Sequence, residues 1–97
     1  MTGNKERKRV TDEAKYQRNS MFRMQFEKAQ DCHVLLFPEG MVKLSDSAAE
    51  ILTQFASPRA VSEVIALLEE KFPGADLADD VHQFVEVAYD KKWIERC

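Results

Sequence analysis

The side chains in this chain best suited to bind a metal or to act as a nucleophile are Cys32, His33, His82 and Cys97. A zinc site usually contains such residues in closely spaced pairs, as in Cys-x-x-Cys, and neither cysteine has a partner of this kind. Because neighbouring strand residues point to opposite faces, Cys32 could not hydrogen-bond to the His33 ring as a nucleophile does to its base. We therefore expect no metal site and no cofactor, and interpret Cys32 as a small apolar strand residue beside a solvent-facing His33.

Two carboxylates that could work as a general acid and base are adjacent at Asp79 and Asp80. Both are predicted to lie in the first turn of a helix, where the helix dipole favours negative charge without any catalytic role. The basic run at residues 5–9 could contact phosphate groups, but a flexible cluster does not read a base sequence. No set of acid, base and oxyanion-stabilising groups is visible, so we expect no catalytic residue and no enzyme.

The elements that would hold these side chains begin with a hairpin at residues 31–44. Pro38 and Gly40 fit the second and fourth positions of a type I turn, which predicts strands at residues 34–37 and 41–44. The first of these strands is apolar on both faces. This pattern indicates that one face packs on the core and that the other needs a separate cover.

A further strand is predicted at residues 22–26, where Phe22, Met24 and Phe26 alternate with polar residues. Three consecutive strands would form a meander with the 34–37 strand in the centre. Both outer strands would then keep one row of unpaired main-chain groups. Such an edge can accept an extended peptide as an additional strand.

Three helices are predicted after the hairpin. Ser45 or Asp46 can cap the first helix, which is expected to end near residues 57–58. Asp76 is expected to cap the third helix. The apolar periodicity places the second and third helices at residues 61–72 and 77–89.

These elements predict an α+β fold, namely a small winged-helix-like domain in which a three-stranded antiparallel sheet is followed by a three-helix bundle. We place the domain at residues 21–97, with Trp93 and Ile94 packing back onto the core. Residues 1–20 are interpreted as a flexible polar tail, because they have too few apolar side chains to offset the entropy of ordering.

The distribution of charge argues against the alternative of a winged-helix nucleic-acid-binding protein. Residues 1–23 contain seven Lys or Arg and three acidic residues, whereas residues 24–97 contain seven and fourteen. The predicted third helix has no Lys or Arg between Asp76 and Asp90, so it would repel phosphate groups. We therefore expect no nucleic-acid partner.

The sequence contains no secretory apolar block after Met1, and no stretch approaches the roughly 20 apolar residues of a membrane helix. Two cysteines are too few for a disulfide-based fold, although one bridge between Cys32 and Cys97 stays open as an alternative. We expect a reduced, cytoplasmic protein with no membrane partner.

Over about residues 22–96 the chain resembles the pyrroloquinoline quinone (PQQ) biosynthesis protein D family, PqqD. The resemblance is carried by the segments Met24-Gln25-Phe26-Glu27, His33 to Leu44, Ser47 to Leu52, Val64-Ile65 and Asp80-Val81-x-x-Phe84. The hairpin run from residue 33 to 44 is the specific part.

Two positions depart from the family pattern. Ala60 stands where a helix-capping Thr is usual, which predicts a helix start weakened by roughly 1 kcal/mol. Lys92 stands where a Gly often precedes the final apolar pair, which predicts an altered C-cap geometry.

The resemblance implies a peptide chaperone that holds the precursor peptide PqqA and presents it to the radical SAM enzyme PqqE. Domains of this type act as recognition elements for ribosomally made, modified peptides (RiPP recognition elements). In them the peptide is added beside the third strand of the sheet, in a groove shared with the last helix. Mapped by this resemblance, the peptide-binding residues are Met41, Val42, Lys43 and Leu44 of the strand and Val81, Phe84, Val85 and Ala88 of the helix.

Physical arguments add three expectations about this region. Lys43 places a charge on the free edge, which protects it from aggregation. Val42→Pro is expected to abolish binding by removing a strand donor. The helical stripe can equally be core, with only its margin in contact with a ligand. A homodimer is a further alternative, in which a second copy covers the apolar face of the 34–37 strand.

Overall fold

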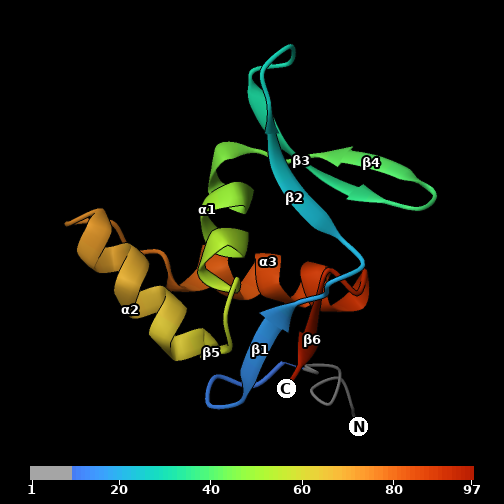
Figure 1. The fold of residues 1–97 in the computed structure, drawn as a ribbon. Coiled ribbons are helices and arrows are strands. Elements are labelled where there is room, and N and C mark those ends of the chain that lie inside the picture. Colours follow the sequence, from blue (N-terminus) through green and yellow to red (C-terminus); the bar gives the residue numbers. More distant parts are fainter. Residues whose placement is uncertain (1–9) are drawn as a thin grey trace, which may run out of the picture.

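The computed structural model describes residues 10–97, which fold into two small sheets and three helices (Figure 1). The elements in chain order are β1 (Lys15–Arg18), β2 (Arg23–Glu27), β3 (Cys32–Phe37), β4 (Gly40–Lys43), α1 (Asp46–Gln54), β5 (Arg59–Ala60), α2 (Val61–Lys71), α3 (Ala78–Asp90) and β6 (Ile94–Arg96). The predicted α+β class is confirmed. The prediction of a single sheet was wrong, because the strands form the sheets β2-β3-β4 and β5-β1-β6.

The sheet β2-β3-β4 is the predicted antiparallel meander with β3 in the centre. Leu35 of β3 lies opposite Met24 and Val42, and these three side chains contact the hydrophobic core. The alternation of a strand therefore directs Val34 and Met41 to the opposite face. Val34 is nevertheless fully buried, whereas Met41 is 44% exposed.

The second sheet includes residues that the sequence analysis assigned to a flexible tail. Tyr16 in β1 is fully buried, and β1 pairs with β5 on one side and β6 on the other. Val10 is also buried. Residues 10–20 therefore do not form the expected tail. The buried Tyr16 ring supplies the apolar surface that holds them, and a single aromatic residue among polar ones gave no apolar pattern in the sequence. Residues 1–9 of the expected tail lie outside the described residues.

The segment before β1 is attached to α3 by polar contacts. The Val10 N–H donates to Glu86 Oε2 at 3.3 Å, and His82 Nε2 lies 2.9 Å from Asp12 Oδ1. The Thr11 N–H donates to the Tyr16 hydroxyl at 3.1 Å. These contacts give His82 a structural role on the side of α3 that faces the N-terminal segment.

The first two helices begin differently. Ser45 caps α1, since its Oγ accepts a hydrogen bond from the Ala48 N–H at 3.1 Å, as predicted. Helix α1 ends at Gln54, a few residues before the expected end. At the start of α2, Ala60 offers no side-chain acceptor, and only Glu63 contributes, by accepting the Ala60 N–H at 2.8 Å. Ala60 thus contributes no capping bond of its own, and the weakening of the helix start by roughly 1 kcal/mol stays a prediction.

The prediction that Asp76 caps α3 was wrong. Leu77 occupies the N-cap position and makes no side-chain cap bond. Its N–H donates instead to Glu69 Oε2 of α2 at 2.9 Å. The acceptor at the start of α3 is therefore a side chain of another helix. Asp79 and Asp80 lie in the first turn of α3, as expected.

The end of α3 turns through Lys92, which has a left-handed φ of 69°. The Lys92 N–H donates to the Tyr89 carbonyl at 3.1 Å and the Trp93 N–H to the Ala88 carbonyl at 2.8 Å, the pair of bonds of a Schellman motif. This turn sends Trp93 and Ile94 into the core, as predicted. Strand β6 follows and pairs with β1, which the sequence did not indicate.

One hydrophobic core joins the two sheets. Leu35 from one sheet and Tyr16 from the other pack in the same cluster as Phe55, Val64 and Val85. In Figure 1 the sheet β2-β3-β4 lies at one end of the molecule and the strands β1 and β6 at the other, with α1 between them. The core therefore fixes β4 and α3 in one rigid frame.

Candidate functional site

Strand β4 has one open edge. It pairs only with β3, and no other strand among residues 10–97 lies beside it. The Leu44 N–H donates to the His33 carbonyl at 2.9 Å, which fixes the phase of the ladder. Since bonded and non-bonded pairs alternate in an antiparallel ladder, Val42 and Leu44 face β3, and the main-chain groups of Met41 and Lys43 face outward.

The same phase argument describes the other outer strand, β2. Because Leu35 directs its main-chain groups towards β4, Val34 and Leu36 direct theirs towards β2. Met24 and Phe26 therefore present their main-chain groups at the free edge of β2. Within residues 10–97 the sheet thus has two open edges, with two outward-facing residues each in β2 and β4.

A groove of about 990 Å³ lies between the start of α1, the end of α2 and the first half of α3. It begins where β4 ends, because both His33 and Ser45 line it. Its apolar surface includes Phe84, and two side chains are unusually exposed for their type, namely Phe72 at 43% and Val87 at 46%. The groove can accommodate apolar side chains of a ligand.

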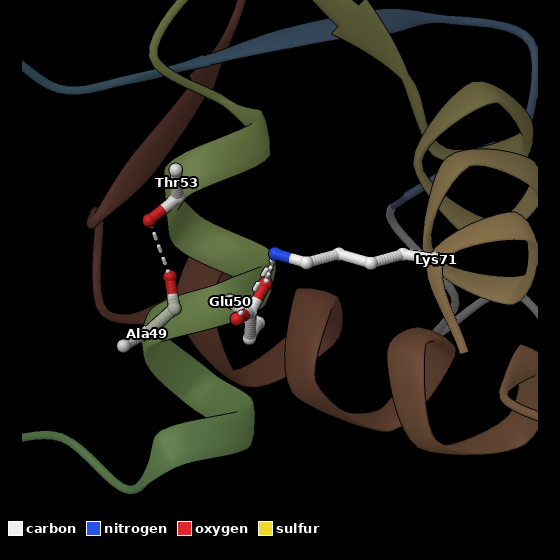
Figure 2. Close-up of polar contacts among 4 residues, drawn as sticks. All are labelled: Ala49, Glu50, Thr53 and Lys71. Atoms are coloured by element: carbon white, nitrogen blue, oxygen red, sulfur yellow. Dashed lines mark hydrogen bonds and ion pairs between the residues drawn. The ribbon is translucent and has the colours of Figure 1, made fainter.

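An ion pair joins α2 to α1 (Figure 2), and both of its residues line the groove. Lys71 Nζ lies 2.9 Å from Glu50 Oε1 and 3.3 Å from Oε2. The Thr53 hydroxyl donates to the Ala49 carbonyl at 2.7 Å, so its proton is used within α1 (Figure 2). Lys71 is the one lysine or arginine among the described residues that line the groove, and its charge is already matched.

The expected helical site residues divide into two groups. Val81 and Phe84 line the groove. Val85 and Ala88 do not line it, are fully buried and belong to the core. On the strand, Leu44 is also buried, and Val42 packs against the core. Met41 and Lys43 are therefore the strand residues that expose both side chain and main chain.

The sequence analysis missed several groove residues. Val87 lies at the margin of the apolar stripe of α3, beside Gln83 and Phe84, and a helical-wheel reading of that margin could have found it. Phe72 was read as part of the buried stripe of α2, but it is the residue after the helix and is largely exposed. His33 was expected to face solvent. It lines the groove, and its ring lies 5.1 Å from the Phe26 ring.

The residue types that could bind a metal are dispersed. His82 pairs with Asp12, and Cys97 Sγ lies 3.8 Å from Gln17 Oε1. Cys32 and Cys97 are both free thiols, so the alternative of a bridge between them is not realised. Over residues 10–97 no three His, Cys, Asp or Glu side chains gather as a metal-binding group.

In the described part of the chain, none of the helices has the length and apolar character needed to cross a membrane.

Comparisons with known proteins agree on one family. Residues 32–94 match the family model for coenzyme PQQ synthesis protein D, PqqD. The chain is 55% identical over 75 residues to the PqqA binding proteins of Azotobacter vinelandii and Pseudomonas aeruginosa, an alignment that covers 76% of this chain and 82% of each relative. Identity to the PqqA binding protein of Rahnella aquatilis is 51% over 74 residues, covering 75% and 78%.

The fold is similar to a solved structure of a peptide recognition element. The NMR structure of the PqqD truncation of Methylobacterium extorquens PqqCD, described as a functional and stand-alone RiPP recognition element, superimposes with a TM-score of 0.76. It covers 94% of this chain and 99% of that chain at 22% identity. Two small sheets packed with three helices thus place this chain in the fold class of that recognition element. The sequence matches make the family definite: the chain belongs to the coenzyme PQQ synthesis protein D (PqqD) family.

Proposed function

We propose that this protein binds the precursor peptide PqqA by adding a peptide strand to β4, and that it presents the bound peptide to the radical SAM enzyme PqqE. The observation that carries the proposal is the open edge of β4, where Met41 and Lys43 turn unpaired main-chain groups outward. Main-chain hydrogen bonds to such an edge provide affinity, and alternate side chains of the peptide provide specificity. The names of the relatives, PqqA binding protein, support the choice of peptide.

The choice of β4 over β2 rests on the groove. His33 and Ser45 place one end of the groove at the end of β4. A peptide strand on β4 could therefore continue past Leu44 and bury its side chains against Val81 and Phe84. In this assignment Val85 and Ala88 support the helix from within the core and do not contact the peptide.

The proposed role is that of a binding adaptor without catalytic activity. The charged side chains of the described groove are carboxylates, one histidine and a lysine engaged with Glu50. We infer a winged-helix arrangement in which β3 and β4 form the wing. The acidic first turn of α3, with Asp79 and Asp80, opposes the use of this arrangement on nucleic acid. The two free thiols accord with the reduced cytoplasmic setting that the proposal assumes.

A homodimer through the outer face of the sheet remains a subordinate proposal. Met41 is exposed there beside Lys43, but Val34 is already fully buried within a single chain. Sedimentation velocity over a hundredfold range of concentration, with and without PqqA, distinguishes a monomer from a dimer and shows whether the peptide competes with dimer formation.

The direct test is an NMR titration of the uniformly ¹⁵N-labelled full chain with synthetic PqqA. We expect saturable binding with the largest amide shifts at Met41 and Lys43 and along the groove. Shifts confined to Met24 and Phe26 would assign the peptide to β2 instead. Absence of saturable binding would refute the proposed function.

A further inference from the structure

Asn19, in the connection between β1 and β2, forms hydrogen bonds through both its main chain and its side chain. Its N–H donates to the Trp93 carbonyl at 2.8 Å, and its carbonyl accepts the Phe22 N–H at 3.0 Å. Its Nδ2 donates to the Lys92 carbonyl at 3.0 Å, and its Oδ1 accepts the Met21 N–H at 3.0 Å. Asn19 thus bonds both to the turn after α3 and to the turn that leads into β2.

The two side-chain bonds of Asn19 need a donor and an acceptor on one short side chain. The bond to Met21 is a local Asx turn, which asparagine and aspartate both form. The bond to Lys92 joins residues 73 positions apart. It requires the amide group, because an ionised aspartate has no proton to donate to a carbonyl.

An aromatic contact on each side leads from Asn19 to the candidate site. The Trp93 ring lies 6.1 Å from the ring of Phe84, which lines the groove. The Phe22 ring lies 5.2 Å from the ring of Phe37, which pairs with the first residue of β4. The residues to which Asn19 bonds therefore pack against both parts of the candidate site, the groove and the strand edge.

These two parts belong to different portions of the fold. The open edge belongs to the sheet β2-β3-β4, whereas α3 continues through its C-terminal turn into β6 of the other sheet. At residues 19–22 the chain passes directly from one sheet to the other, beside the C-terminal end of α3 (Figure 1). The direction of the chain at this point therefore bears on how β2-β3-β4 is oriented relative to α3.

We propose that Asn19 is a positioning residue for the peptide site. Its bond to the Lys92 carbonyl fixes β2-β3-β4 relative to α3, so that one peptide can pair with β4 and reach Phe84 at the same time. Asn19 does not line the groove, and its effect on affinity comes from preorganisation of the site. This inference rests on the proposed function, because it assumes that one peptide uses both parts of the site.

The first test measures Kd for synthetic PqqA by calorimetry on the full chain. Asn19→Asp keeps the acceptor for Met21 and both main-chain bonds, and loses only the donor to Lys92. We expect Kd to rise about two- to five-fold, the effect of losing one ordinary hydrogen bond. Ser20→Asp adds the same charge at the neighbouring exposed position and should leave Kd unchanged. Val85→Ala, which destabilises the core away from the groove, controls for loss of stability and should also leave Kd nearly unchanged.

The second test measures residual dipolar couplings on the same ¹⁵N-labelled proteins without peptide. In the wild type and in Ser20→Asp, couplings from β2-β3-β4 and from α3 should fit one alignment tensor. In Asn19→Asp each of the two groups should still fit by itself, but a joint fit to the wild-type orientation should fail. A local loss of folding would instead spoil the separate fits, so this signature distinguishes positioning from stability.

The outcomes separate the two proposals. If PqqA binds the wild type with amide shifts at Met41 and Lys43, an unchanged Kd or an unchanged orientation in Asn19→Asp refutes the positioning role and leaves the strand addition standing. An equal rise of Kd in Ser20→Asp also refutes it, because the added charge would then be the cause. If PqqA does not bind the wild-type protein, both proposals are refuted.

Discussion

The Leu44 N–H donates to the His33 carbonyl at 2.9 Å, and this single bond determines which way every main-chain group of β4 points. Every second residue counted back from Leu44 bonds to β3, and the residues between them direct their main-chain groups to the open edge. The main-chain groups of Val42 are therefore used within the hairpin, and those of Met41 and Lys43 face the open edge.

Lys43→Pro should weaken peptide binding strongly while leaving the domain folded. Proline removes an N–H that points outward, and an edge strand tolerates this change. We expect Kd for PqqA to rise about ten-fold or more, since a main-chain bond and the close approach of the guest are both lost. Calorimetry measures the affinity, and Lys43→Ala is the control that loses the charge but keeps the donor.

Val42→Pro should act differently from the expectation drawn from sequence. Its N–H bonds to β3, so proline would break the hairpin and unfold β4 instead of blocking the edge selectively. A well-dispersed NMR spectrum for Val42→Pro, combined with the spectrum of an unfolded protein for Lys43→Pro, would contradict this assignment. It would show that the Lys43 N–H faces β3 and the Val42 N–H faces outward.

Val87→Ala and Val85→Ala should separate binding from stability. Val87 is exposed on the groove, so its truncation should raise Kd up to about five-fold and change the free energy of unfolding by less than about 0.5 kcal/mol. Val85 is fully buried, so its truncation should cost about 2 kcal/mol of stability with little change in Kd. Urea denaturation and calorimetry give both quantities, and equal effects on both would contradict this division.

Tyr16→Ala should destabilise the whole domain. Its ring is fully buried and meets the Tyr89 ring edge-on at a centroid distance of 5.8 Å. We expect a loss of about 3–5 kcal/mol in the free energy of unfolding, as for other buried aromatic residues. Gln17→Ala changes an exposed side chain of the same strand and should stay within about 0.5 kcal/mol. An unchanged free energy of unfolding for Tyr16→Ala would contradict the packing of β1 and support the original expectation of a flexible tail.

Lys92→Gly should stabilise the protein. Lys92 adopts a left-handed φ of 69°, which costs a residue with a Cβ roughly 1 kcal/mol. Glycine relieves that strain and keeps both bonds of the Schellman motif. Lys91→Gly is the matched control, because Lys91 has an ordinary φ of −87° and should lose stability on the same change. Urea denaturation of the three proteins checks the expected order.

Local signals predicted much of the fold. The alternation of apolar and polar residues around Phe22, Met24 and Phe26 predicted β2, and Ser45 was one of two residues predicted to cap α1. The departure at Lys92 falls on the residue that the structure places in the left-handed region, but the expected change of C-cap geometry was wrong, because Lys92 keeps both bonds of the Schellman motif. Each of these signals depends on residues close together in the chain.

The features that were missed depend on distant partners. Strand β1 is stabilised by β5 and β6, which lie far along the chain, and a single Tyr16 in a polar segment gave no periodic signal. Leu77, and not Asp76, is the N-cap of α3, and its N–H is accepted by Glu69 of α2, a contact between two helices that the local sequence does not reveal. At the candidate site the pattern located β4 but could not show which of its N–H groups point outward. It therefore named all of Met41 to Leu44 and aimed the proline substitution at Val42, whose N–H faces β3.

The pairing of β1 with β6 also determines how the protein can be handled. These strands place Cys97 at the end of the molecule away from the β3–β4 turn (Figure 1). The Cys97 thiol is free and exposed, whereas Cys32 is half-buried. A fluorophore or a biotin anchor attached to the Cys97 thiol would leave the strand edge and the groove accessible. The fold thus offers a natural point of tethering for single-molecule and surface-based measurements.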